Sequence, residues 1–293
     1  MIGFINLHKT TGMTSHDCVY QIRKSLKIKR VGHGGTLDPA ASGVLSIAVG
    51  GATRLLSYLS GQKVYEAIIR LGVITTTDDL EGDILYQCSA SQLTIAQVVP
   101  QLSKFIGKIA QVPPAYSAIS VGGVRLYEKA RKGEVFEIPT RQVEIYTIEL
   151  IDWLGGEFPE LKLKITCAPG TYIRSIARDL GKVLGVGGTL AGLIRLESGG
   201  FILEESISLE QLHNRLENGI FSLISPEVAL KHLDKVDLLK EETKYFLQGR
   251  EILLNKNPST ENCLVFGEGE FLGVGQRGEQ NTLNPKVVLF THP

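Results

Sequence analysis

The chain has no excess of charge of either sign, because 31 lysine and arginine residues balance 31 aspartate and glutamate residues. The overall charge therefore gives no sign of a nucleic-acid partner, and any such binding must come from local clusters. The four cysteines, at positions 18, 88, 167 and 263, lie far apart and form no Cys-x-x-Cys pair. This spacing argues against a structural zinc site and against a secreted disulfide scaffold.

Long apolar runs are missing as well. No uninterrupted run of apolar residues is long enough to span a membrane. The N-terminus, from Met1 to Asn6, lacks the charged segment and the apolar stretch of a signal peptide. We therefore expect no membrane partner and a cytoplasmic location. With 293 residues the chain can bury a sizeable core, and one large domain with one small domain is the natural expectation.

The most informative segment surrounds a single acid, Asp38. This residue follows a glycine-rich turn, 32–35, and directly precedes Pro39. Small residues around an acid allow a large, flat group to approach it closely. Asp before Pro is also a common start of a helix or turn, so the dipeptide alone indicates no chemistry. The upstream run from Arg23 to Arg30 contains no acid. An acid beside a patch that could hold phosphates suggests chemistry on a nucleic acid.

Hydrophobic periodicity predicts a mixture of strands and helices. The expected strands cover residues 3–7, 44–49, 63–73, 142–153, 161–167 and 190–196. The expected helices cover residues 15–26, capped by Thr14, and 51–59, 93–106 and 173–184. A polar, acidic loop is expected over 75–82. Because antiparallel neighbours are expected among the strands, the pattern indicates an α+β fold.

Two regions depart from this pattern. Pro113 and Pro114 open an insertion of about residues 112–141, which carries a basic segment, 122–133, expected to form a short helix. After Pro226, a helical piece to about residue 231 precedes short strands at 251–254, 263–266, 271–274 and 287–290. This spacing predicts a small barrel-like module of roughly 65 residues. We therefore expect a catalytic domain over 1–225 and a second module over 226–293.

Four features are weak alone but occur in a characteristic order. They are Asp38 after its glycine-rich turn, Tyr65 on a strand, Arg174 one turn into a helix, and the basic segment of the insertion. With their surroundings they resemble the TruB-type tRNA pseudouridine synthases, which isomerise the uridine at position 55 in the T-loop of transfer RNA. The matching segments are Gly12-x-Thr14-Ser15, 31–45, 51–53, Lys63-x-Tyr65, 72–82, 111–118, 123–133, 170–175, 179–181, Leu193-x-Arg195 and Ser198-Gly199.

The departures from the family pattern are modest. The family usually begins with Asp-Lys-Pro, whereas this chain has His8-Lys9-Thr10. Ser46 stands where proline is common, and Leu196 where threonine is common. These differences concern local loop shape rather than the chemistry. The C-terminal segment resembles a PUA-type RNA-binding module only loosely, through residues 271–275 and 284–286.

The resemblance implies a fold and a mechanism. The fold is a pseudouridine synthase fold, with a mixed, largely antiparallel central sheet flanked by helices and loops, and a small C-terminal β-rich, PUA-like module. Asp38 would be the nucleophile, at the sugar C1′ or by assisting elimination there, with attack at uracil C6 as the older alternative. Arg174 would keep that carboxylate ionised. Tyr65 would stack on the uracil and could act as the base. Substrate and product are isomers, so no redox cofactor, phosphate donor or metal is implied.

Further residues acquire roles by the same resemblance. The target base must be flipped out of its loop, and His33 is a candidate wedge for the gap left behind. Leu193 would help form the apolar wall of the pocket, and Asp79 would support the pocket or position Tyr65 and Arg174. Phosphate contacts are expected from the two basic runs, specifically from Lys29, Arg30, Arg125, Tyr127 and Arg131. Asp78 and Glu81 are interpreted as solvated loop acids.

Each role has an ordinary alternative. Tyrosine on a strand and leucine in a sheet are commonly core residues. Exposed arginine on a helix and a solvated basic face are equally common. A histidine in a turn often serves only the turn, so for His33 the two interpretations stay open.

The implied partner is the T-stem-loop of tRNA, and we expect a monomer. One rival function is a non-catalytic RNA-binding or RNA-folding relative, against which the joint presence of Asp38, Tyr65 and Arg174 argues. A second is a guide-RNA-dependent relative, which usually carries a larger C-terminal module and lysine-rich tails that this sequence does not show. A glycosidase would use two paired carboxylates, and only Asp38 stands in the motif.

Overall fold

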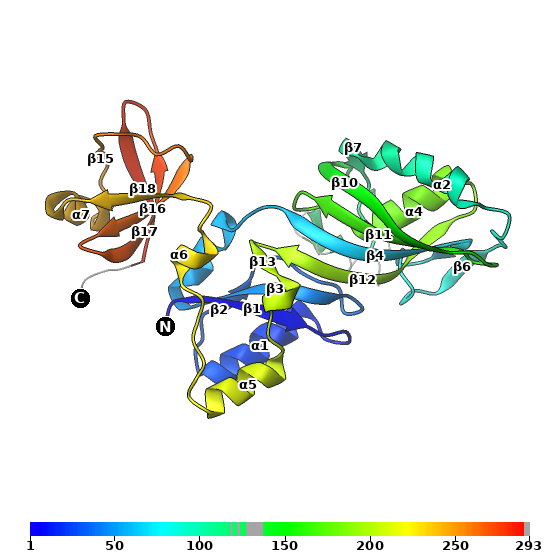
Figure 1. Ribbon diagram of the computed structural model, residues 1–293, viewed down its shortest axis with the longest axis horizontal. Coiled ribbons are helices and arrows are strands. Elements are labelled where there is room, and N and C mark those ends of the chain that lie inside the picture. The colour runs from blue at the N-terminus through cyan, green and yellow to red at the C-terminus, as the bar shows by residue number, and fades with distance from the viewer. Residues whose placement is uncertain (118, 122–123, 127–136, 290–293) are drawn as a thin grey trace. The chain divides into compact units, whose positions relative to one another are not determined.

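The structure, a computed structural model, describes residues 1–117, 119–121, 124–126 and 137–289. The chain forms two compact units (Figure 1). Unit 1 contains Met1–Pro39, Gly43–Ser60 and Ser198–Pro293, and unit 2 contains Ala40–Ser42 and Gly61–Glu197. The chain thus begins in unit 1, builds unit 2 and then returns to unit 1.

Unit 1 holds both ends of the sequence. Its helices are α1 (Ser15–Leu26), α5 (Leu209–Glu217), α6 (Pro226–Ala229) and α7 (Lys240–Leu247), with 3-10 turns η1 (Gly50–Tyr58) and η3 (Leu203–Glu205). Its strands are β1 (Gly3–Lys9), β2 (Val31–His33), β3 (Ser42–Val49), β13 (Phe201–Ile202), β14 (Asp234–Leu238), β15 (Ile252–Leu253), β16 (Asn262–Gly267), β17 (Glu270–Arg277) and β18 (Thr282–Val288).

Unit 2 is built from the middle of the chain. Its helices are α2 (Ile95–Leu102), followed by the 3-10 turn η2 (Ser103–Phe105), and α4 (Ile173–Val183). Its strands are β4 (Lys63–Leu71), β5 (Val73–Thr75), β6 (Ile84–Gln87), β7 (Gly107–Gln111), β8 (Ser120–Val121), β9 (Val124–Arg125), β10 (Arg141–Leu154), β11 (Glu160–Cys167) and β12 (Gly188–Ser198).

Helix α1 begins where its capping residue predicts. The Thr14 hydroxyl accepts from the Asp17 backbone N–H at 3.0 Å, and the Asp17 carboxylate accepts from the Thr14 N–H at 2.9 Å. This reciprocal pair satisfies two N–H groups that the first helical turn leaves free. The helix ends at Lys27, whose φ of 55° is left-handed. The predicted helix 15–26 is confirmed.

The sheet of unit 1 is covered on both faces. Strand β3 pairs antiparallel with β1 and with β2. Because side chains alternate along a strand, the residues of β1 and β3 divide between two clusters. Ile5, Leu7, Leu45 and Ile47 pack with residues of α1 and α5. The opposite face contributes Phe4, Val44 and Ala48, which pack with β16, β17 and β18 of the C-terminal segment. The C-terminal strands therefore share a core with the N-terminal sheet.

The C-terminal strands form a five-stranded sheet in the order β14-β16-β17-β18-β15. Strand β14 is parallel to β16, and the other neighbours are antiparallel. The sheet runs as an open path rather than the predicted barrel. Strand β18 begins at Thr282, five residues before the strand predicted at 287, and its register with β17 shifts beside Pro285. A proline cannot donate to the ladder, so the alternating pattern is interrupted there.

The sheet of unit 2 has the order β12-β4-β11-β10-β7. Strands β10 and β11 are antiparallel, which confirms the pairing predicted for residues 142–153 and 161–167. Strand β11 also pairs with β4, where Tyr65 lies opposite Ile165. Helix α4 contacts β4, and α2 contacts both α4 and β10. The buried side chains of β4 alternate with half-buried ones, so one face of the strand belongs to the core.

Two predicted elements of unit 2 are corrected. The strand expected over 63–73 ends at Leu71, because Gly72 has a φ of +87° and turns the chain. The expected polar loop over 75–82 is the connection between β5 and β6, and only its first residue, Thr75, belongs to a strand.

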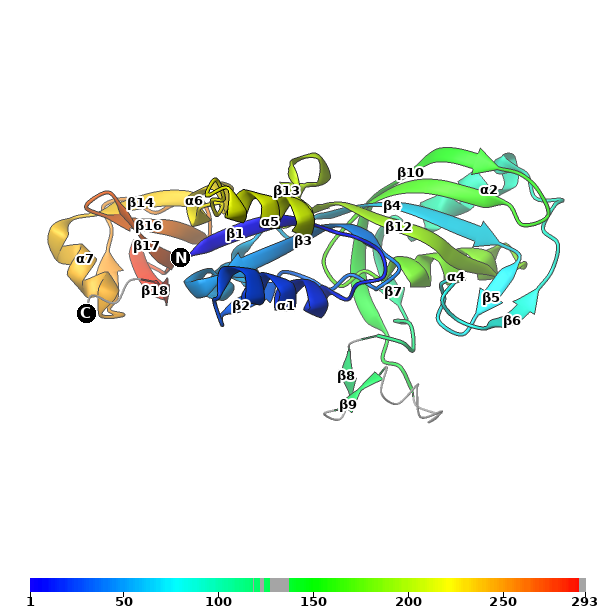
Figure 2. The same cartoon turned by 90° about the horizontal axis from the view of Figure 1, so that it is seen from below.

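The second correction concerns the insertion. Within the segment expected to be a short basic helix, Val124–Arg125 is strand β9, paired antiparallel with β8 in a hairpin (Figure 2). The β-branched residues Val121 and Val124 lie opposite one another and favour the extended conformation. Leu126 is helical, and residues 122, 123 and 127–133 of the expected helix lie outside the described residues.

Gly181 sets how closely helix α4 packs in unit 2. A Cβ at Gly181 would lie 2.1 Å from the backbone carbon of Gly187 and 2.1 Å from the nitrogen of Gly188. We expect Gly181→Ala to lower the free energy of unfolding by about 2 kcal/mol or more, because backbone atoms cannot yield as a side chain does. Gly155→Ala is the matched control, since a Cβ there would meet only Trp153, at 3.7 Å. Urea unfolding of both variants measures the difference, and equal stability of the two would contradict the packing argument.

Candidate functional site

Asp38 lies in unit 1, in a loop whose backbone is fixed on both sides of it. The Leu37 N–H donates to the Ser15 hydroxyl at 2.8 Å, and that hydroxyl lies 3.2 Å from the Leu37 carbonyl oxygen. On the other side, the Pro39 carbonyl accepts from the Gly12 N–H at 2.9 Å. The Leu37 side chain is buried and Asp38 is half-buried. The carboxylate is therefore presented from a backbone that is held at the preceding and the following residue.

A buried lysine contributes to this loop. Lys9, only 1 % exposed, directs its ammonium at three backbone carbonyls. The Nζ–O distances are 2.7 Å to Met13, 3.0 Å to Thr10 and 3.3 Å to Pro39. A buried cation needs such acceptors, so the chain around Asp38 is tied to the end of β1. Lys9 is the part of the expected Asp-Lys-Pro motif that this chain retains.

The other predicted residues of unit 1 lie before the Asp38 loop. His33 ends β2, and its Nδ1 accepts from the Gly35 N–H at 3.3 Å. Lys29 and Arg30 are exposed, and the Arg30 Nε donates to the Thr53 hydroxyl at 2.8 Å. Arg23 turns inward instead and donates to the Val31 carbonyl at 2.8 Å. The basic run therefore divides into a structural member and an exposed group.

Tyr65, Leu193, Asp79 and Arg174 all belong to unit 2. Tyr65 is buried on β4 at 6 % exposure, while Leu193 is half-buried on β12. Strands β4 and β12 are neighbours in the sheet, so both residues lie on adjacent strands.

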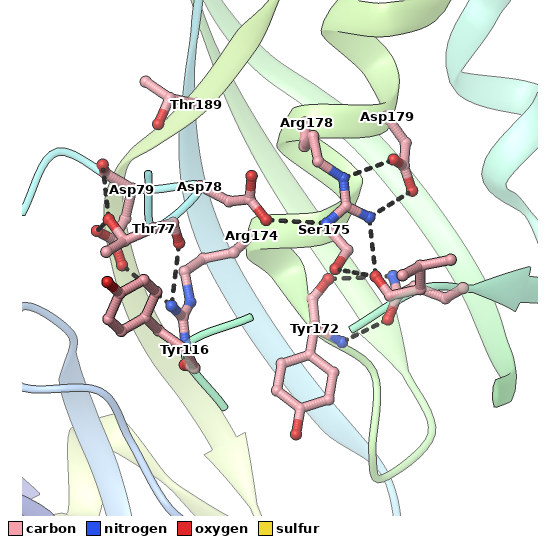
Figure 3. A network of polar contacts seen from close by, with 12 residues as sticks. Thr77, Asp78, Asp79, Tyr116, Tyr172, Arg174, Ser175, Arg178, Asp179 and Thr189 are labelled. Carbon is pink, nitrogen blue, oxygen red and sulfur yellow. Dashed lines mark hydrogen bonds and ion pairs between the residues drawn. The ribbon is translucent and has the colours of Figure 1, made fainter. Parts of the chain in front are cut away.

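The side chain of Arg174 connects three segments of unit 2 (Figure 3). It lies in the first turn of α4 and is only 6 % exposed. Its guanidinium donates to the Thr77 carbonyl at 3.1 Å and to the Tyr116 carbonyl at 3.0 Å. One of its nitrogens lies 3.4 Å from the Asp79 carboxylate. The arginine therefore joins α4 to the loop after β5 and to the start of the insertion.

Asp79 is itself held by its surroundings. At 7 % exposure, its carboxylate accepts from the Thr77 hydroxyl and from the Glu81 N–H. The Leu80 N–H donates to the Leu190 carbonyl, and the Leu190 N–H donates to the Asp78 carbonyl. These bonds attach the acidic loop to β12. The acid that faces Arg174 is thus fixed from both its side chain and its backbone.

Asp78 is not the solvated loop acid that the sequence predicts. Its carboxylate lies 2.9 Å from Arg178, which also contacts Asp179 at 2.9 Å. Burial raises the pKa of Asp78, and Arg178 opposes that rise. Asp78 has a left-handed φ of 62°, which directs consecutive acids to different partners: Asp79 to Arg174, and Asp78 to Arg178. The i, i+4 spacing of the two arginines on a predicted helix was the available signal. Glu81 is exposed, as expected.

The start of the insertion is anchored on α4 (Figure 3). The Gln111 amide exchanges two hydrogen bonds with the Tyr172 backbone, at 2.9 and 3.1 Å. The Val112 carbonyl accepts from Ser175 at 2.9 Å and from Arg178 at 2.8 Å. Sequence reasoning did not identify these anchoring residues. Of the residues expected to bind phosphates from the insertion, Arg125 lies on β9, and Tyr127 and Arg131 lie outside the described residues.

Two kinds of feature are absent from the residues that the structure describes. No cluster of three or more His, Cys, Asp or Glu side chains within them is arranged to hold a metal ion. No helix among them is both long and apolar enough to cross a membrane.

Two known family descriptions match this sequence, one toward its N-terminus and one toward its C-terminus. The family described as "TruB family pseudouridylate synthase (N terminal domain)" matches residues 23–173, and "Pseudouridine synthase II TruB, C-terminal" matches residues 235–289. The first match covers Asp38, Tyr65 and Asp79 and ends one residue before Arg174. The chain belongs to the TruB family.

Curated relatives are similar over nearly the whole chain. A protein named tRNA pseudouridine synthase B from Gloeothece citriformis is 55 % identical and covers 99 % of this chain and 97 % of its own length. Proteins of the same name from Microcystis aeruginosa and a Synechocystis species are 52 % and 48 % identical, each over 99 % of this chain and at least 99 % of their own lengths.

Solved structures share the fold. A chain from the "Crystal Structure of a Cbf5-Nop10-Gar1 Complex" superposes with a TM-score of 0.73 at 26 % identity, covering 98 % of this chain and 85 % of that one. A chain from an H/ACA RNP bound to a substrate RNA gives 0.71 at 26 % identity, with 99 % and 85 % covered. The α+β fold expected for a pseudouridine synthase, with a β-rich C-terminal part, is confirmed.

The Asp79–Arg174 pair allows a direct test of the network in unit 2. Asp79→Asn removes the negative charge beside a buried guanidinium, and we expect a loss of about 3 kcal/mol in the free energy of unfolding. Glu81→Gln, two residues away and exposed, should change stability by less than about 0.5 kcal/mol. Denaturant titration of both variants measures the effect. An Asp79→Asn variant as stable as the Glu81→Gln variant would show that the pair is not a structural requirement.

Proposed function

We propose that this protein converts uridine 55 in the T-loop of tRNA to pseudouridine. The observation that carries the proposal is the near full-length similarity to tRNA pseudouridine synthases, joined to the fixed loop in which the motif places Asp38. An acid that must attack one atom gains from such a loop, because a pre-set position lowers the entropic cost of reaching the transition state.

The reaction breaks the bond from ribose C1′ to uracil N1 and makes a bond from C1′ to C5. The hydrogen on C5 leaves as a proton, and N1 takes up a proton. Asp38 acts as the nucleophile, either at C1′, or by assisting elimination there, or at uracil C6. Covalent catalysis by a carboxylate divides one difficult step into two easier ones. No atoms or electrons are gained overall, so the reaction requires no redox partner.

The remaining roles follow the family pattern. Tyr65 stacks on the uracil and serves as the base. Arg174 stabilises the ionised carboxylate, and Asp79 positions Arg174, which it contacts at 3.4 Å. Leu193 forms part of the apolar wall. His33 fills the space that the flipped base leaves in the loop.

Substrate binding is assigned to the basic groups and to the second module. Lys29 and Arg30 are exposed on unit 1 and bind phosphates, together with Arg125, Tyr127 and Arg131 of the insertion. Residues 1–225 form the catalytic domain, and residues 226–293 form a PUA-like RNA-binding module. The protein acts as a cytoplasmic monomer on free tRNA.

A guide-dependent activity is the second candidate, because the solved structures with this fold include a chain from an H/ACA RNP bound to a substrate RNA. That chain is 26 % identical to this one, whereas the relatives named tRNA pseudouridine synthase B are about twice as similar. The stand-alone tRNA enzyme is therefore favoured.

Tritium release tests the proposal. Purified protein alone is mixed with an unmodified tRNA transcript that carries tritium at uridine C5. We expect release at the T-loop uridine, and a loss of at least about 10³-fold in Asp38→Asn, because the nucleophile is removed. Asp152→Asn, an exposed acid on β10 with no role in the proposed chemistry or RNA binding, is the matched control and should retain full activity.

Other outcomes of the tritium-release experiment distinguish the candidate functions. Binding of tRNA without release would favour a guided or a non-catalytic relative. Release by the Asp38→Asn variant at the wild-type rate would show that another group attacks.

A further inference from the structure

Lys63 is a half-buried cation that the roles assigned above do not use. It is the first residue of β4, two positions before Tyr65, so both side chains lie on the same face of the strand. On one neighbouring strand it lies opposite Cys167. On the other neighbouring strand, β12, Arg195 is fully buried.

The charges around Lys63 do not balance its own. Within the described residues no carboxylate lies at ion-pair distance from it, whereas Lys162 on the opposite face of the same sheet contacts Glu66 at 2.8 Å. The groups that act electrostatically on Lys63 are Arg195 and Cys167. Burial and, next, the positive charge of Arg195 lower the pKa of Lys63 to about 8. Burial raises the pKa of Cys167 to about 11, so this thiol stays neutral and supplies no counter-charge.

The position of Lys63 places it beside the residues proposed to act on the nucleotide. Cys167 ends β11, and the turn that follows leads through Thr171 into α4 and Arg174. In that turn the Thr171 hydroxyl donates to the Ala168 carbonyl at 2.9 Å, and Pro169 lies beside Gly61, just before β4. Lys63 is half-buried rather than enclosed. One end of the sheet of unit 2 therefore brings together Lys63, Tyr65 and the start of α4.

We propose that Lys63 binds a phosphodiester oxygen of the RNA at or next to the nucleotide that is isomerised. The inference rests on the proposed function for its ligand, and on the half-buried, uncompensated cation for its place. A phosphate supplies the missing negative charge, and a charge-assisted hydrogen bond at a partly desolvated site is stronger than one in water. Binding favours the charged ammonium, so RNA binding is accompanied by proton uptake where free Lys63 is partly neutral.

Two substitutions of Lys63 and one control test the proposal by steady-state tritium release. Lys63→Met should raise KM for tRNA about tenfold while the rate at saturation changes by less than about threefold, because a ground-state contact is lost. Lys63→Arg keeps a charge at every accessible pH and should restore most of the affinity. The control is Lys164→Met. Lys164 lies opposite Glu66 on β11, on the other sheet face, and its loss should leave KM unchanged.

The pH profile separates anion binding from a packing role. The wild-type KM should rise as pH increases through about 8, where free Lys63 loses its proton, and Lys63→Arg should remove that rise. A Lys63→Met variant with unchanged KM, or with a reduced saturating rate at unchanged KM, would overturn the proposal. So would a Lys63→Arg variant that binds no better than Lys63→Met.

A stability measurement guards against a simple folding defect. The unfolded chain holds a fully charged lysine near pH 7, whereas burial disfavours that charge in the folded protein. Lys63→Met should therefore raise the melting temperature of the RNA-free protein, and a lowered melting temperature would assign Lys63 to packing and overturn the proposal.

Equilibrium binding distinguishes failure of this proposal from failure of the proposed function. If the wild type binds tRNA without releasing tritium, the proposed function fails. Lys63 is still tested by the slope of log K against log salt, which should fall in magnitude by about 0.7 to 0.9 in Lys63→Met. An unchanged slope would overturn the phosphate contact.

Discussion

The architecture of unit 2 depends on the burial of one guanidinium. Arg174 is nearly excluded from solvent, and removing its charge from water costs free energy. An arginine cannot avoid this desolvation cost by losing its proton, because it stays protonated in proteins. Its charge therefore needs acceptors, and three of these are the Thr77 carbonyl, the Tyr116 carbonyl and the Asp79 carboxylate. Each of these three acceptors lies in a segment without regular structure of its own. The arginine thus determines where two long connections can lie, and the acid loop and the base of the insertion are fixed together with α4.

In unit 1 a buried lysine likewise binds acceptors that come from a loop. The Lys9 ammonium is satisfied by three backbone carbonyls, one of them directly after Asp38. Carbonyl acceptors exist at every residue, so these three contacts do not require particular side chains at the neighbouring positions. That independence explains why His8 and Thr10 can replace the usual acid and proline of the motif. In both units a buried cation immobilises a loop that carries an acid, Asp38 or Asp79, at positions where precise placement matters most.

The sequence predicted elements that local chemistry determines and missed those that tertiary partners determine. The capping pair of Thr14 and Asp17, and the alternation in β10 and β11, are local signals, and both predictions were confirmed. Helix α7 and strand β14 have short, charged sequences whose order comes from packing on the C-terminal sheet, so periodicity did not reveal them. Among the site residues, the position of Asp38 after its glycine-rich turn could be predicted from the sequence. The different ion-pair partners of Asp78 and Asp79 could not be predicted, because they depend on a left-handed φ at Asp78, which is not a glycine.

Lys63 stands out against Lys9 and Arg174 because the described residues supply it with no comparable set of acceptors. Evolution of stability alone would replace such a residue with an apolar one, since burial of an uncompensated charge opposes folding. A lysine at this position is therefore best explained by a ligand that brings the counter-charge. The chain has no net charge to attract RNA at long range, so recognition must rest on cations placed at particular atoms of the substrate. A cation placed beside Tyr65 contributes affinity only once a phosphate has reached that end of the sheet, which couples binding to correct placement of the nucleotide.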